Sequence, residues 1–109
     1  MRVWLIGADK HAIEALHQLQ KNRNIDVTVS ATSATPHAVK DGVIDKVDFV
    51  ETVTPLNINQ LARRVRPDLI LIDPTSGERS FGHVVGGMAL SDALTYEIAA
   101  SSEYPCLIL

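Results

Sequence analysis

Five short runs of valine, isoleucine and leucine alternate along the chain with more polar stretches. They predict strands at Val3–Ile6, Val27–Ala31, Val47–Val50, Leu69–Asp73 and Cys106–Leu109. Several of these runs are apolar without alternation, as strands buried on both faces of a sheet are. The first and fourth runs are the most uniformly apolar. We therefore expect the first strand at the centre of a sheet, with Leu5, Ile70 and Ile72 almost fully buried.

Between these runs, apolar residues recur with the period of a helix. In the segment Asn57–Arg66, residues Ile58, Leu61, Ala62 and Val65 share one face. Similar patterns predict helices at His11–Lys21 and Met88–Ser102, and a short helical turn at Pro36–Lys40. Strands that alternate with helices indicate a parallel sheet. We expect one Rossmann-like domain over residues 1–109, a three-layer α/β/α, doubly wound sheet of five parallel strands in the order 3-2-1-4-5 or 2-1-3-4-5.

Composition narrows the class of protein. The chain has 109 residues, 46% of them hydrophobic, which suffices for one domain with a core. A net charge of −3 argues against a nucleic-acid partner. No apolar run approaches the ~20 residues that cross a bilayer, and no signal peptide is evident. The single cysteine, Cys106, excludes an internal disulfide. A cytoplasmic location fits these features, with Cys106 a buried strand residue.

The turn after the first strand is the leading candidate binding site. Gly7, Ala8, Asp9 and Lys10 lead into a helix whose first N–H groups can bind a phosphate. The dinucleotide-binding fingerprint, G-x-G-x-x-G/A, is incomplete, because Gly7, Asp9 and Ala12 stand at its three small positions. Alternatively, Asp9 is simply the N-cap of this helix. NAD(P) or another nucleotide is the candidate cofactor, and we expect NAD binding to be weak or absent.

Other candidate contacts follow the second and fourth predicted strands. Dinucleotide-binding domains carry an acid after the second strand, whereas this chain has the hydroxyl residues Ser30 and Thr32. Asp73 ends the fourth strand, where it could bind a ligand or cap the loop. The glycine-rich segment Pro74–Gly87 follows, and its Arg79 could hold a phosphate or a carboxylate. No catalytic constellation and no metal-ligand spacing is visible.

Two stretches also carry a family resemblance. The opening MRVWLIGADKHA and the segment VRPDLILID, which precedes the glycine-rich loop, resemble the NAD(P)-binding group that includes the TrkA-type regulatory domains of potassium channels. This resemblance implies a nucleotide at Gly7–Lys10 and Ser30–Thr32. The pattern of Asn57, Leu61, Pro67 and Asp68 is similar to the domain that precedes ATP-grasp enzymes. That resemblance implies a domain that supports substrate binding without catalysing a reaction alone.

The segment RPDLILID is also similar to the strand of response-regulator receivers that ends in the phosphorylated aspartate, here Asp73. We therefore expect a non-catalytic module that binds a nucleotide or another small ligand. It would be regulatory or the N-terminal part of a larger protein, and a homodimer or other domains would be its protein partners. The alternative is a degenerate, receiver-like interaction module without phosphorylation. The strand order 3-2-1-4-5 would favour the first hypothesis.

Overall fold

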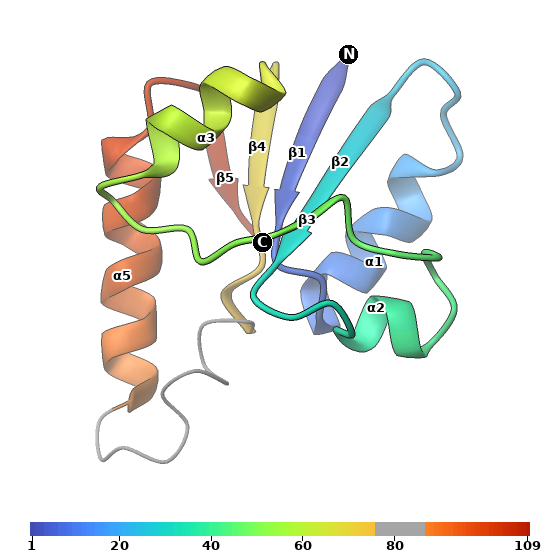
Figure 1. The fold of residues 1–109 in the computed structure, drawn as a ribbon, viewed down its shortest axis with the longest axis horizontal. Helices are drawn as coiled ribbons and strands as arrows, with labels where there is room; N and C mark the ends of the chain where they lie inside the picture. The colour runs from blue at the N-terminus through green and yellow to red at the C-terminus, as the bar shows by residue number, and fades with distance from the viewer. Residues whose placement is uncertain (76–86) are drawn as a thin grey trace.

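The computed structural model describes residues 1–75 and 87–109, and its centre is a sheet of five parallel strands (Figure 1). The strands are β1 (Arg2–Ile6), β2 (Asp26–Ala31), β3 (Phe49–Val50), β4 (Leu69–Ile72) and β5 (Cys106–Ile108). Their order is β3-β2-β1-β4-β5, with every neighbouring pair parallel. The central position of β1 is thereby confirmed. This order matches the first five strands of the 3-2-1-4-5-6 order of dinucleotide-binding domains, and it differs from the 2-1-3-4-5 order of receivers.

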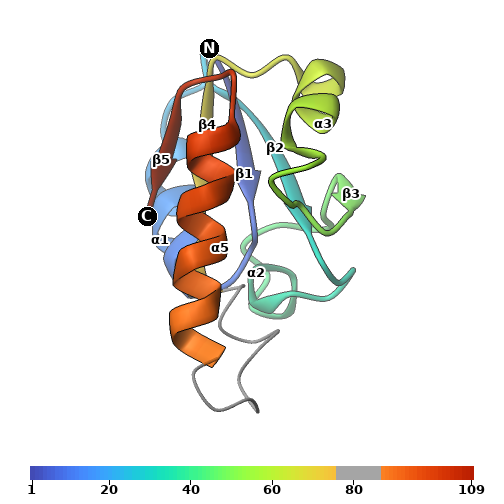
Figure 2. The same ribbon diagram turned by 90° about the vertical axis from the view of Figure 1, so that its left-hand side faces the viewer.

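Helices cover both faces of the sheet and make the predicted three layers. They are α1 (Lys10–Leu19), α2 (His37–Lys40), α3 (Ile58–Val65) and α5 (Gly87–Ser101). Figures 1 and 2 show α1 and α2 on one side of the sheet and α3 and α5 on the other. All helix and strand bounds lie within two residues of the ranges expected from the sequence. The three-layer α/β/α fold class is therefore confirmed.

Alternation along β1 divides the core into two clusters. Val3 and Leu5 face α1 and α2, whereas Trp4 between them faces α3 and α5. Trp4 and Leu5 are fully buried (0% exposed), and so is Ile70 of β4. Ile72 is 3% exposed, so the burial expected for Leu5, Ile70 and Ile72 is confirmed. A central strand with large apolar side chains on both faces explains why the sequence pattern of β1 lacks alternation.

The edge strand β3 is shorter than expected, because its first two predicted residues do not pair as a strand. Asp48 instead closes this end of the sheet with two bonds to Val29 of β2. The Asp48 carboxylate accepts a hydrogen bond from the Val29 N–H at 2.7 Å, and the Asp48 N–H donates to the Val29 carbonyl oxygen at 2.8 Å. A side chain therefore replaces part of the expected backbone ladder.

Within the described residues, no helix combines the length and the apolar character that spanning a bilayer requires.

Candidate functional site

The loops that follow β1, β2 and β4 meet at the carboxyl edge of the sheet. We call this region the crest, and it comprises residues 7–9, 32–37 and 73–75. Gly7 begins the first loop with a φ of +90°, a backbone conformation that L side chains rarely adopt. The Gly7 N–H donates to the carbonyl oxygen of Ser30 at 2.7 Å, which joins the ends of β1 and β2. The crest is thus built from neighbouring strands, as expected for an α/β sheet.

The carboxylate of Asp73 sits at the amino end of α1. Its Oδ2 accepts hydrogen bonds from the backbone N–H of Asp9 at 3.1 Å and of Ala12 at 2.9 Å. Asp9 occupies the N-cap position, but its side chain makes no capping hydrogen bond. The expected N-cap position of Asp9 is therefore confirmed, but the expectation that its side chain satisfies the N–H groups of this helix is wrong. The cap comes from the end of β4, more than sixty residues along the chain.

The second oxygen of Asp73 is also engaged. Its Oδ1 accepts from the backbone N–H of Thr75 at 2.9 Å and from the Thr75 hydroxyl at 2.5 Å. Asp73 is 2% exposed, and its bonds to Asp9 and Ala12 are buried, whereas those to Thr75 are partly buried. Because a carboxylate already neutralises the positive end of α1, a phosphate could reach these N–H groups only by displacing Asp73.

Asp9 turns its carboxylate toward the start of α2. Its Oδ1 lies 2.9 Å from His37 Nδ1 and accepts the backbone N–H of His37 at 3.2 Å. The Ala38 N–H donates to the Ala8 carbonyl oxygen at 2.9 Å, which adds a second tie between the two loops. The side chain of Asp9 is 7% exposed and that of His37 51% exposed. A buried carboxylate thus orients an imidazole whose ring reaches solvent.

Sequence reasoning did not select His37 as a site residue. The histidine follows Pro36 in a polar stretch and lies far from Asp9 in the chain, so local patterns carry no sign of the pair. Its ring geometry is informative, because the bond to Asp9 requires Nδ1 to carry a hydrogen. In the neutral ring, Nε2 is then a hydrogen-bond acceptor.

The other expected site residues separate into three groups. Ser30 is fully buried, and its hydroxyl accepts a hydrogen bond from Trp4 Nε1 at 3.0 Å. It therefore points into the core and does not contribute its side chain to the crest, contrary to our expectation. Thr32, in the crest, and Lys10, the first residue of α1, are both exposed. Arg79 and most of the glycine-rich loop lie outside the described residues.

Two further observations limit the chemistry of the described residues. Among the side chains that the structure describes, in the ranges 1–75 and 93–109, no three gather in a way that could hold a metal ion. His11, in the first turn of α1, has a buried Nδ1 that lacks a hydrogen-bond partner in the same ranges. Burial raises the pKa of the half-buried Cys106 thiol to about 11, so this cysteine is a poor nucleophile at neutral pH.

No protein-family model, no curated protein and no solved structure significantly matches this chain.

Proposed function

We propose that this chain is a Rossmann-like, non-catalytic module that binds a small ligand at the crest, with hydroxyl-bearing ligands such as nucleosides as the favoured class. The observation that carries this proposal is the Asp9–His37 pair, in which a buried carboxylate holds an exposed imidazole. A histidine fixed in this way is pre-organised to contact a ligand, because little rotamer freedom is left for binding to remove. The neighbouring Thr32 is exposed and could add a hydroxyl contact.

The class of ligand follows from what each loop can still bind. At the amino end of α1, the N–H groups of Asp9 and Ala12 are already bonded to Asp73. A pyrophosphate bound there, as in dinucleotide-binding domains, is therefore disfavoured. Above β2, the Nε2 of His37 can accept a hydrogen bond from a hydroxyl group when the ring is neutral. Together these features favour a nucleoside, or a nucleotide whose phosphate points away from α1.

Amide chemical-shift titration of the labelled protein with adenosine, AMP and NAD tests the proposal. We expect adenosine to shift the amides of residues 8–10 and 32–38 and to bind more tightly than NAD. His37→Ala should weaken adenosine binding about tenfold or more, the loss expected for a hydrogen bond to a polar ligand group. His17→Ala is the matched control, since His17 is exposed on α1 and belongs to no crest loop. It should leave binding unchanged.

Three results would contradict the proposal. The first is the absence of saturable shifts with all three ligands. The second is a set of shifts that lies outside the crest. The third is an equal effect of His37→Ala and His17→Ala, which would show that the histidine at the crest is not a ligand contact.

A further inference from the structure

A groove with a volume of about 640 Å³ lies between α3 and the outer half of the sheet. We call it the α3 groove, and its apolar lining includes Phe49, Leu61 and Val65. None of the crest residues lines it. Ligand sites in proteins commonly have volumes of about 300–1,000 Å³ with mostly apolar walls. The α3 groove therefore has the size and lining of a small-molecule site separate from the crest.

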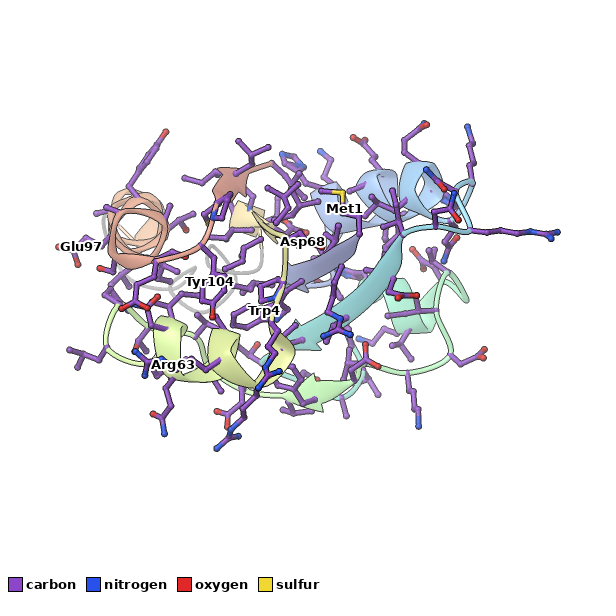
Figure 3. All side chains as sticks on the ribbon, turned by 90° about the horizontal axis from the view of Figure 1, so that it is seen from above. Met1, Trp4, Arg63, Asp68, Glu97 and Tyr104 are labelled. Atoms are coloured by element: carbon purple, nitrogen blue, oxygen red, sulfur yellow. The ribbon has the colours of Figure 1, made fainter. Side chains whose placement is uncertain are left out.

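The groove exists because α3 covers only part of its face of the sheet. The register places Trp4 of β1 beside Thr28 of β2, on the face toward α3. Trp4 is fully buried in the cluster that includes Leu61, and Figure 3 shows it between the sheet and α3. Thr28, one strand further out, is only partly buried and lines the groove. Phe49 of β3 lies beyond it, with its ring centre 6.0 Å from that of Trp4.

Two arginines line the end of the groove beside the carboxyl terminus of α3. Arg2 Nη1 donates to the carbonyl oxygen of Val65 at 3.0 Å, which fixes this guanidinium and leaves its other N–H groups available. Arg64 is exposed, and its guanidinium has no hydrogen-bond or ion-pair partner among the described side chains of residues 1–75 and 93–109. A guanidinium that lacks a partner and borders an apolar hollow is suited to a carboxylate or another planar anion.

Two acids also line the groove, and the register of the strands places them differently. Asp26 lies beside Arg2 in the register of β1 and β2, at the amino ends of the strands, where its negative charge offsets one of the two positive charges. Glu51 follows β3, whose last residue pairs with Ala31 at the opposite end of β2. The Asp68 carboxylate also lies at the end beside Arg2 and accepts the backbone N–H of Arg2 at 2.8 Å, so the charges around Arg2 and Arg64 are balanced. The preference of this end for an anion therefore depends on the guanidinium of Arg64, and the end at Glu51 disfavours an anion.

From this arrangement we propose that the α3 groove binds a small amphipathic carboxylate. Its aryl or alkyl body lies against Phe49 and Leu61. Its carboxylate pairs with Arg64, and Arg2 supplies a second donor. The burial of the apolar body provides the affinity, and the unpaired guanidinium sets the orientation and selects the charge. This proposal does not depend on a ligand at the crest.

Three probes with the same phenylbutyl body and different head groups test it: 4-phenylbutyrate, 4-phenylbutan-1-ol and 4-phenylbutylamine. We expect 4-phenylbutyrate to shift the amides of Thr28, Phe49–Glu51 and Leu61–Val65 in a saturable titration. The alcohol and the amine should bind at least about fivefold more weakly, since a charge-assisted hydrogen bond is lost. Trp4 fluorescence, through its contact with Phe49, gives a second readout.

Two exposed neighbours on α3 provide the matched variants. Arg64→Gln should weaken 4-phenylbutyrate binding about fivefold to tenfold and leave the alcohol unaffected. Arg63→Gln should change neither, because Arg63 does not line the groove and lies 3.7 Å from Glu103 instead. The proposal is overturned by an absence of saturable binding, by shifts that fall elsewhere, by tighter binding of the amine or alcohol, or by equal effects of the two substitutions.

Discussion

The β1–α1 turn and the β2–α2 loop lie side by side at the crest, and they differ in how their polar groups are satisfied. In the first, Gly7, Ala8 and Asp9 are buried, and the amino end of α1 is bonded to Asp73. In the second, residues 32–35 are exposed, and the exposed His37 is held by a single buried carboxylate. The comparison teaches that, at the same sheet edge, one loop is buried and leads into a helix capped by a carboxylate of the fold, whereas the other loop is open to solvent.

This difference bears on how binding potential is assigned to such a fold. A helix that begins after the first strand suggests a phosphate site. Here the interior of the protein supplies the anion, so the helix end stabilises the fold instead. The adjacent loop, which lacks the acid found in dinucleotide-binding domains, gains a polar anchor through Asp9. Each prediction below tests one side of this comparison, from the largest expected effect to the smallest.

The largest effect is expected from Asp73→Ala, which removes the acceptor for the N–H groups of Asp9, Ala12 and Thr75. Buried donors left without a partner cost about 1–3 kcal/mol each, partly relieved by water that enters. We therefore expect the free energy of unfolding to fall by about 3–5 kcal/mol in urea denaturation. Asp26→Ala, at an exposed position, should change it by less than about 0.5 kcal/mol. Similar losses for both variants would show that the cap is unimportant.

The same substitution should expose the anion-binding capacity of α1. Provided that Asp73→Ala remains folded at low temperature, AMP should bind it more tightly than it binds the wild-type protein. Adenosine should bind the two equally, since it carries no phosphate. Titration calorimetry measures both ligands. A variant that folds and binds AMP no better would show that Asp73 is not what keeps phosphate away from the helix.

An intermediate effect is expected from Asp9→Ala on the other side of the comparison. The change releases His37 and leaves its backbone N–H without an acceptor, so α2 loses an anchor to the β1–α1 turn. We expect a loss of about 2 kcal/mol in the free energy of unfolding. Amide exchange should accelerate at His37 and Ala38 more than in β1. Uniform acceleration over the whole chain would contradict a local role for Asp9.

A smaller effect is expected from Ser30→Ala. The variant leaves the buried Trp4 Nε1 without its acceptor, which should cost about 1–2 kcal/mol and shift the tryptophan emission. Because the hydroxyl points into the core, ligand affinity at the crest should not change. A loss of adenosine binding without a loss of stability would show that the Ser30 side chain contacts the ligand.

The smallest effect on stability is expected from His37→Ala, because the imidazole is half-exposed and the Asp9 carboxylate keeps the backbone N–H of residue 37 as a donor. We expect a change of less than about 1 kcal/mol in the free energy of unfolding. A loss above that of Asp9→Ala would show that the imidazole, rather than the backbone, anchors α2.

Much of the fold could be predicted from the sequence because its determinants are local. The apolar runs of β1 and β4 mark strands buried on both faces, and the periodic spacing of Ile58, Leu61 and Val65 marks α3. The presence of Asp73 at the end of a strand also followed from the pattern, since it comes directly after Leu69–Ile72. The sequence pattern of β2 also indicates the direction in which the Ser30 side chain points. In β2, Val27 and Val29 alternate with Thr28 and Ser30, which places Ser30 on the face of Trp4.

The sequence by itself therefore determined the elements, the parallel α/β class and the loops that could form a site. Only the tertiary structure decided which of the two expected strand orders is adopted and which carboxylate caps α1. It also decided that Asp9 pairs with His37 and that an uncovered stretch of sheet beside α3 forms a groove. The physical reason is the distance along the chain over which each interaction acts. Hydrophobic periodicity acts between residues a few positions apart, whereas the partner of a buried carboxylate depends on strand register between segments distant in the chain.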